Sequence, residues 1–163
     1  MNSDEMKRST NHRMLDLAQS YADENSTCCK VKVGSLILIP STLVFIYGCN
    51  HGVHRCTKNG CRRVMLYGEA SKQHRLPSDC DAVHSEIDAI SKAAKDGHKL
   101  DGATIYVSRY PCENCARAVA AAGIKKVIYG RTESISDYTQ QILDDAGVEV
   151  YKIDDWDWED NHE

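Results

Sequence analysis

The connection between the last two apolar segments restricts the fold of this chain more than any other feature. Residues 125–130 (KKVIYG) and 148–153 (VEVYKI) have strand character, and about 17 residues separate them. The second half of this connection, DYTQQILDDAG, has a helical pattern and ends at Gly147. A crossover of this length that contains a helix joins parallel strands, whereas a tight hairpin joins antiparallel ones. The sequence therefore predicts that its last two strands are parallel.

The rest of the chain also alternates between helix and strand patterns. Its predicted elements are, in chain order, a helix over 9–24, strands over 31–39 and 42–50, a helix over 84–97, a strand over 103–108 and a helix that closes at Gly123. The first two strands form a hairpin that turns at Pro40-Ser41. This order predicts an α/β fold with three layers, α/β/α, in which helices cover both faces of a mixed five-stranded sheet.

The length of 163 residues fits one domain with a hydrophobic core of its own. We expect a single domain over residues 1–153, with a basic, cysteine-containing insertion over 54–80 and an acidic tail over 154–163. The tail carries six acidic residues and no Lys or Arg, so we expect it to be solvated, although Trp156 and Trp158 at alternating positions could dock on a neighbour.

Location affects how the cysteines are interpreted. No apolar run reaches the roughly 20 residues of a membrane helix, and the first residues, MNSDEMKRSTNHR, lack the apolar core of a secretory signal. We therefore expect a cytoplasmic protein without a membrane partner. Because reducing conditions disfavour structural disulfides, clustering among the eight cysteines indicates metal binding or catalysis.

Two of these cysteines stand in the first turn of the helix that closes at Gly123. Cys112 and Cys115 are three residues apart and lie on one helix face, although a CxxC pair by itself also occurs in redox disulfides and zinc ribbons. Upstream, His84 begins another helix, and the intervening helix, turn and strand would bring both helix starts to the same edge of the sheet. We expect one imidazole and two thiolates to converge there on a zinc ion.

Three protein ligands leave the fourth position of zinc open, which is typical of a catalytic site rather than a structural one. Glu86 lies two residues after His84. A carboxylate that is near the metal without binding it can take a proton from water and deliver it to a leaving group. We therefore predict that Glu86 is the catalytic proton shuttle.

The two motifs taken together, HSE at residues 84–86 and PCENC at 111–115, match the HxE and PCxxC signature of zinc nucleobase deaminases. Longer segments extend the similarity: STCCKVKVGSLI, GCNHGVH, HSEIDAI, LDGATIYVSRYPCENCARAVAAAGIKKVIYG and AGVEVYKI. Over residues 26–153 the chain resembles the deoxycytidylate deaminases of the zinc-dependent cytidine deaminase superfamily, including late-competence and phage members. The resemblance implies a cytidine deaminase-like fold and the hydrolysis of dCMP to dUMP and ammonia in nucleotide-pool metabolism.

The resemblance also implies roles for individual residues. His84, Cys112 and Cys115 would hold the catalytic zinc, and Glu86 would move the proton as water attacks C4 of cytosine. Asn50 would hydrogen-bond the sugar or the phosphate. The other residues implied in the substrate pocket are Ala82, His84, Ser85, Ser108, Tyr110 and, if it stacks on the nucleotide rather than packing partly in the core, Tyr138.

Three positions depart from the family pattern. His51 replaces the second glycine of the Gly-x-Asn-Gly turn, Ser85 replaces the alanine of HAE, and Asp88 replaces the asparagine of the NAI triplet. None of these changes removes a zinc ligand. His51 and Asp88 leave the nucleotide preference open.

The insertion raises the question of a second metal, because some relatives carry a structural zinc in this region. We select Cys28, His54, Cys61 and Cys80 as its ligands, with Cys56 as a substitute. A zinc ion at such a site would stabilise a long loop that has few apolar residues of its own. Buried free thiols are the alternative.

The insertion is also strongly basic. Between residues 54 and 75 it contains six Lys and Arg residues and a single acid, Glu69, in a chain whose net charge is −4. This concentration indicates either an anionic partner, with nucleotide phosphate as the natural candidate, or a solvated basic loop.

Partners and alternative functions complete the prediction. Relatives of this kind are often hexamers regulated by deoxycytidine triphosphate and thymidine triphosphate, so the resemblance implies a homo-oligomer with such effectors.

A tRNA or single-strand nucleic acid deaminase shares the metal signature, but the acidic net charge disfavours nucleic acid. A modified cytosine nucleotide or guanine could be the substrate instead. A noncatalytic zinc-binding assembly protein is the alternative from another class, although it would have no need for Glu86.

Overall fold

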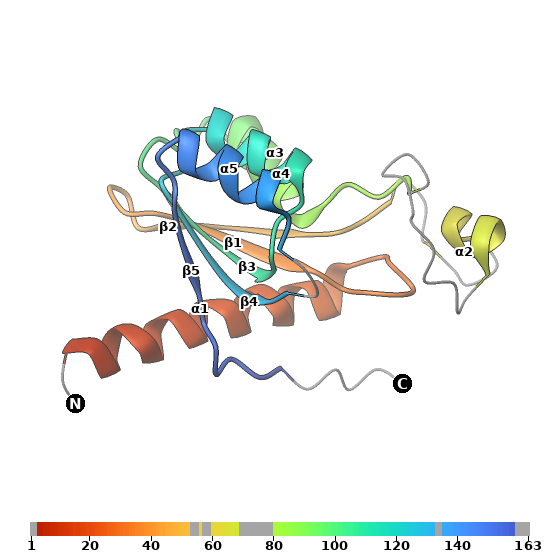
Figure 1. The fold of residues 1–163 in the computed structure, drawn as a ribbon, viewed down its shortest axis with the longest axis horizontal. Coiled ribbons are helices and arrows are strands. Elements are labelled where there is room, and N and C mark those ends of the chain that lie inside the picture. The colour runs from red at the N-terminus through yellow and green to blue at the C-terminus, as the bar shows by residue number, and fades with distance from the viewer. Residues whose placement is uncertain (1–2, 53–55, 57–59, 69–79, 133–134, 159–163) are drawn as a thin grey trace.

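A five-stranded sheet lies between one long helix and a layer of three helices in the computed structural model of the chain (Figure 1). The structure describes residues 3–52, 56, 60–68, 80–132 and 135–158. The strands are β1 (Gly34–Ile39), β2 (Val44–Cys49), β3 (Thr104–Arg109), β4 (Lys126–Arg131) and β5 (Glu149–Lys152). The helices are α1 (Ser3–Asn25), α2 (Arg62–Tyr67), α3 (Ser85–Lys95), α4 (Glu113–Ala121) and α5 (Asp137–Asp145). None of these helices is long and apolar enough to cross a bilayer.

The sheet has the strand order β2-β1-β3-β4-β5. β1 pairs antiparallel with β2 and with β3, whereas β3 and β4, and β4 and β5, run parallel. The prediction of a mixed five-stranded sheet with its last two strands parallel is therefore confirmed. This order places β3, the strand that leads into α4, in the centre of the sheet.

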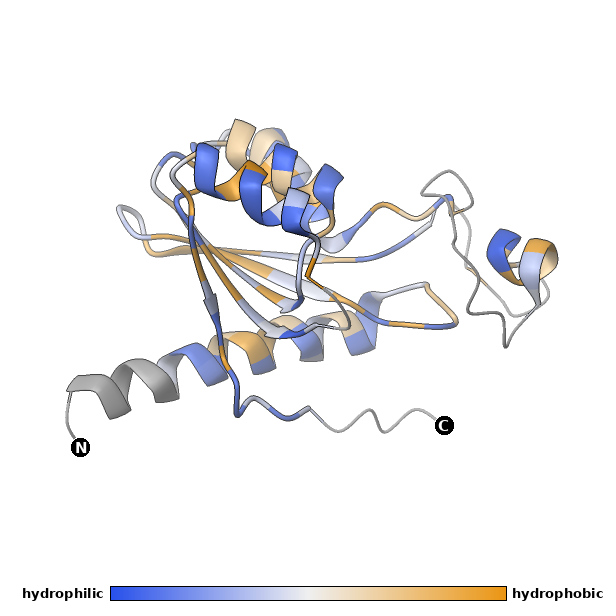
Figure 2. Ribbon diagram, in the orientation of Figure 1, coloured by the Kyte–Doolittle hydropathy of each residue, from blue (hydrophilic) through white to orange (hydrophobic). Residues whose placement is uncertain are grey.

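Alternate residues of each strand fill two separate hydrophobic cores, because successive side chains of a strand point to opposite faces. Ile37, Ile105 and Val127 belong to the larger core, under α3, α4 and α5. Their neighbours Leu36 and Tyr106 belong to the smaller core, against α1. Apolar residues accordingly concentrate along the strands in the middle of the molecule (Figure 2).

Two helices differ from the sequence prediction. α1 starts at Ser3 rather than at residue 9, and its first turns lie beyond the sheet (Figure 1). α2 lies within the insertion, where the sequence pattern predicts no helix. Its Met65 and Leu66 are exposed, so no buried apolar stripe marks this helix in the sequence.

The beginning of the acidic tail packs on the body of the protein. Trp156 is buried in the smaller core with Ile128, and its Nε1 donates a hydrogen bond of 2.8 Å to Asp16 of α1. Trp158 donates a hydrogen bond of 3.1 Å to Asp23 of the same helix. The two indoles of this part thus dock on α1, whereas Asp154, Asp155 and Asp157 are exposed. The packed part of the chain continues to Trp158.

α3 approaches the hairpin very closely. A Cβ atom at Gly48 of β2 would stand 2.1 Å from the carbonyl oxygen of Ser85 and 2.7 Å from the amide nitrogen of Ala89. The Ser35 hydroxyl of β1 donates a hydrogen bond of 2.7 Å to the same Ser85 carbonyl. Only a glycine allows this approach, and the hydrogen bond fixes the first turn of α3 to the sheet.

We expect Gly48→Ala to lower the free energy of unfolding by about 1–3 kcal/mol, since the added methyl group overlaps backbone atoms of α3 that cannot turn aside. Urea unfolding of the native protein and the variant measures the difference. A variant as stable as the native protein would show that α3 does not depend on this close contact.

Candidate metal centre

Two helices begin beside each other at one end of the sheet and carry the residues of the site. His84 is the N-cap of α3, and Cys112 is the N-cap of α4. The turn from β3 into α4 is held by the N–H of Tyr110, which donates a hydrogen bond of 2.8 Å to the carbonyl of Arg131 at the end of β4. The parallel pairing of β3 and β4 thus determines where α4 starts.

The imidazole of His84 and two thiols of α4 converge at these helix starts. His84 Nδ1 lies 3.5 Å from Cys112 Sγ and 3.4 Å from Cys115 Sγ. Tetrahedral zinc with ordinary Zn–N and Zn–S bonds separates such ligand atoms by roughly 3.6 Å. The structure therefore brings together the three residues selected from the sequence, in a donor set and spacing that fit Zn²⁺.

The two thiols share one negative charge. A hydrogen bond from Cys115, assisted by His84, lowers the pKa of Cys112 to about 3 against the effect of burial. The same hydrogen bond, together with burial, raises the pKa of Cys115. The hydrogen bond with Cys112 raises the pKa of His84, although burial and the positive charge of Arg63 oppose this. A divalent cation at this point would stabilise both thiolates.

Glu86 lies buried next to these ligands, with only 4% of its surface exposed. Burial raises its pKa. The Ser85 hydroxyl donates a hydrogen bond of 3.1 Å to Glu86 Oε2, which orients the carboxylate. A carboxyl group whose pKa is raised toward neutrality, beside a metal centre, is suited to accept a proton and to release it again.

Asp88 of α3 is a second buried carboxylate, and two of the departures from the family pattern meet at it. Its Oδ1 lies 3.1 Å from His51 Nε2. Its Oδ2 accepts hydrogen bonds from Lys92 Nζ over 2.6 Å and from the N–H of Cys49 over 3.0 Å. Burial acts to raise the pKa of Asp88, but these hydrogen bonds outweigh it and hold the pKa below its ordinary value. The residues at positions 51 and 88 are therefore partners.

His51 also holds the segment that precedes α3. Its N–H donates a hydrogen bond of 3.1 Å to the carbonyl of Val83, and the N–H of Val83 donates one of 2.8 Å to the carbonyl of His51. His84 is consequently held on both sides, by this bridge before it and by the bond between Ser35 and Ser85 after it.

A cavity of about 730 Å³ opens at the metal centre. Its volume lies within the range of about 300–1,000 Å³ that is usual for small-molecule sites. The sequence-selected residues that line it are Asn50, Ala82, His84, Ser85, Glu86, Tyr110 and Cys112. The predicted substrate residues therefore surround one space, with two exceptions.

The exceptions are Ser108 and Tyr138, which do not line the described part of the cavity. Ser108 is buried, and its Oγ accepts a hydrogen bond of 3.0 Å from the N–H of Gly34, which ties β3 to β1. Tyr138 is 51% exposed, with the guanidinium of Arg117 over its ring. It is therefore not part of the core, and no described contact joins it to the cavity.

Asn50 lines the cavity while its amide holds the cavity wall. Its Oδ1 accepts a hydrogen bond of 2.8 Å from the N–H of Val33, and its Nδ2 donates one of 2.8 Å to the carbonyl of Val31. Val31 and Val33 line the same cavity. The side chain of Asn50 thus shapes the wall in addition to any contact it makes with a ligand.

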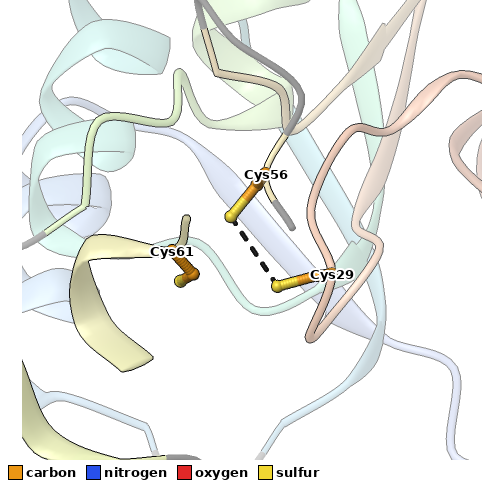
Figure 3. A group of neighbouring side chains, drawn as sticks. All are labelled: Cys29, Cys56 and Cys61. Carbon is orange, nitrogen blue, oxygen red and sulfur yellow. Dashed lines mark hydrogen bonds between the residues drawn. The ribbon is translucent and has the colours of Figure 1, made fainter. Parts of the chain in front are cut away.

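A second group of thiols lies near the cavity. The sulfur atoms of Cys29, Cys56 and Cys61 all lie within 4.8 Å of one another, and those of Cys29 and Cys56 are 3.7 Å apart (Figure 3). Burial raises the pKa of Cys29, and it raises that of Cys56 to about 12. Cys61 is the N-cap of α2, where the N–H groups of Val64 and Arg63 overcome the effect of burial and lower its pKa.

This group differs from the ligand set selected from the sequence. Cys61 and the substitute Cys56 belong to it, whereas Cys28 and Cys80 line the cavity without joining it. His54 lies outside the described residues. Cys29 takes part in place of Cys28, because two adjacent side chains of the chain do not both reach the same point.

The basic lining of the cavity is the feature that the sequence indicates least clearly. Among the described residues, four cationic ones line it: Lys30, Arg62, Arg63 and Arg109. The charge of the insertion is a signal for the two arginines of α2. Nothing in the sequence marks Lys30 or Arg109, which come from segments far apart in the chain.

Comparisons with known proteins identify relatives of this chain. The family model described as "Cytidine and deoxycytidylate deaminase zinc-binding region" matches residues 8–131. The chain is 46% identical over 110 residues to a deoxycytidylate deaminase of Mycobacterium phage D29, covering 66% of this chain and 84% of that protein. It is 38% identical over 98 residues to a deoxycytidylate deaminase of Enterobacteria phage T2, covering 60% of this chain and 52% of the relative, so that it spans about half the length of that protein.

Among solved structures, the dCMP deaminase from the cyanophage S-TIM5 in complex with dCMP and dUMP is similar to this chain. The two share 27% sequence identity and a TM-score of 0.66, over 93% of this chain and 98% of that one. The likeness covers the sheet and the helices that hold the metal centre.

We expect Asp88→Asn to lower the free energy of unfolding by about 1.5–3 kcal/mol near neutral pH, because it weakens hydrogen bonds made to a charged group. The native pKa of Asp88 lies below the ordinary 3.8, so this stabilisation is present above that pH and is lost as the pH falls through the native pKa. Urea unfolding from about pH 7 to about pH 3 measures the effect. A difference between native and variant proteins that does not shrink on acidification would contradict the assignment.

Proposed function

The chain belongs to the cytidine and deoxycytidylate deaminase zinc-binding family, and from this premise we propose that it deaminates a deoxycytidine nucleotide, converting dCMP and water to dUMP and ammonia. The observation that carries the proposal is the group of His84, Cys112 and Cys115 beside the buried Glu86. Three ligands leave a zinc ion open to a reacting molecule, and Glu86 has no structural purpose in a closed metal site.

The residues of this chain have separable roles in the proposed reaction. His84, Cys112 and Cys115 would hold zinc, which supplies Lewis acidity that makes water more acidic. Glu86 accepts the proton of the attacking water and delivers it to the leaving amine, so the exocyclic nitrogen departs as ammonia. The Ser85 hydroxyl keeps the carboxylate of Glu86 directed at the reacting carbon.

A free nucleotide is the substrate class that the charge favours. The net charge of −4 disfavours a long nucleic acid, whereas the cavity itself is lined by four basic residues, Lys30, Arg62, Arg63 and Arg109. A small anion can enter this local positive region without meeting the acidic remainder of the surface. Deamination of a modified cytosine nucleotide or guanine, and a noncatalytic role, are outcomes that the substrate test below distinguishes.

The thiols of Cys29, Cys56 and Cys61 would supply three ligands of a second zinc ion with a structural role, and His54, selected from the sequence, would supply the fourth. Zinc thiolates in tetrahedral geometry are roughly 3.8 Å apart, close to the 3.7 Å between Cys29 and Cys56. The ion would fasten the segment after α1 to the start of α2, and so would hold the insertion against the domain. Three reduced thiols packed together are the alternative.

The cytoplasmic location, the hexameric assembly and the regulation by deoxycytidine and thymidine triphosphates stay predictions. They rest on the sequence and on the resemblance.

We expect native protein to release ammonia from dCMP with loss of the cytosine ultraviolet band, and not from guanine or a tRNA anticodon stem. A panel that also contains cytidine, dCTP and 5-methyl-dCMP tests the substrate range. Turnover of guanine or RNA alone, or silence on every compound with zinc bound, would refute the proposed function.

In the same assay, Glu86→Gln should reduce turnover at least about 100-fold, because the amide cannot accept the proton. Its zinc content should equal that of the native protein, since Glu86 is not a ligand. Activity that survives this substitution would remove Glu86 from the mechanism.

Metal analysis of purified protein should give about two zinc ions per chain. Cys29→Ser should lower this to about one, whereas the neighbouring Cys28→Ser should leave about two. A native value near one would end the proposal of a second ion. Loss of zinc in Cys28→Ser but not in Cys29→Ser would restore the ligand set selected from the sequence.

A further inference from the structure

We propose that Arg63, in the helix α2 that the insertion adds to the domain, binds the phosphate group of the nucleotide substrate. The inference rests on the proposed function and assigns the residue that distinguishes a nucleotide from a nucleoside. It requires that Arg63 faces the substrate cavity, that it has hydrogen-bonding capacity to offer, and that α2 is held in place.

Arg63 faces the cavity that contains the metal centre. It lines the same space as His84, Glu86 and Cys112. The base of a bound nucleotide must lie at the zinc ligands, so its phosphate lies farther out along the cavity. α2, whose Arg63 lines the cavity, lies beyond the segment that leads into α3 (Figure 1).

Arg63 has hydrogen-bonding capacity to offer. Its Nε is buried and has no hydrogen-bond partner among the described residues. An unpaired buried donor costs free energy, so a ligand that satisfies it gains affinity. The guanidinium presents its N–H groups in a planar fork that matches two phosphate oxygens.

The neighbouring Arg62 differs in this respect. It also lines the cavity, but its guanidinium lies 3.8 Å from the carboxylate of Asp81, and both side chains are largely exposed. Arg62 therefore has a carboxylate partner on the cavity wall. This leaves Arg63 as the arginine of α2 whose charge is not matched by a described carboxylate.

The start of α2 is tied to the thiol group. Cys61 is the N-cap of α2, and its sulfur lies beside those of Cys29 and Cys56 (Figure 3). The first turn of α2, which carries Arg63, is thereby connected to the segment that follows α1. A six-residue helix with no buried residue would not hold an arginine in place by itself.

The test compares binding of dCMP and deoxycytidine, which differ only in the phosphate. Isothermal titration calorimetry with zinc-loaded Glu86→Gln protein, which does not turn over, gives both affinities. Adding Arg63→Gln should weaken dCMP about 10-fold to 100-fold and leave deoxycytidine unchanged. Arg63→Lys should lie between, because it keeps the charge without the fork. Lys95→Gln, which removes an exposed charge from the last turn of α3, should change neither affinity.

Kinetics of the otherwise native enzyme give a second readout, in which Arg63→Gln should raise KM for dCMP with little change in kcat. Equal affinity for dCMP with and without Arg63 would overturn the inference, and so would a parallel loss of deoxycytidine binding in both Arg63 variants. Neither result would contradict the proposed deamination. That proposal is refuted if the native protein does not deaminate dCMP.

Discussion

The contact between the first turn of α3 and the β1–β2 hairpin positions the rest of the site. Gly48 lets the backbone of α3 touch the sheet, and the Ser35 hydroxyl binds the carbonyl of Ser85 at that point. His84 and Glu86 lie on either side of Ser85 in the chain. The hydrogen bond from Ser35 and the absence of a side chain at Gly48 therefore position both the metal ligand His84 and the proton acceptor Glu86. Because β3 pairs with β1 on one side and β4 on the other, α4 starts at the same end of the sheet and its two thiols face His84.

The buried carboxylate of Asp88, near the site, is matched by its partners. Asp88 has Lys92, His51 and the N–H of Cys49 around its carboxylate, so the family's usual asparagine can be replaced without leaving an unpaired charge. His51 adds a backbone bridge to Val83, which holds the segment before His84. The two substitutions stabilise one another and maintain the geometry of the metal centre, although neither touches the metal ligands.

The insertion contributes to the same cavity by different means. With Met65 and Leu66 exposed and no buried residue in α2, hydrophobic packing does not hold it. Its attachment is the group of Cys29, Cys56 and Cys61, which joins chain segments on both sides of the hairpin. The sheet holds the inner end of the site, and the cysteine group holds its outer wall. The reaction at the inner end can therefore stay the same while residues of the outer wall determine which group beyond the base is bound.

The sequence by itself determined the local features: the strands and most helices, the parallel last strands, and the motif that places His84, Glu86, Cys112 and Cys115 at two helix starts. These follow from hydrophobic period, connection length and short spacings, which are properties of neighbouring residues. Only the tertiary structure decided that Cys29 rather than Cys28 joins the second thiol group, that Ser108 ties two strands together, that Trp156 is buried, and that Arg63 lines the cavity. Each of these depends on which of two neighbouring side chains faces a segment that is distant in the sequence. The packing of the layers decides this, because burial and hydrogen bonding between distant segments outweigh the local conformational propensity of the residues.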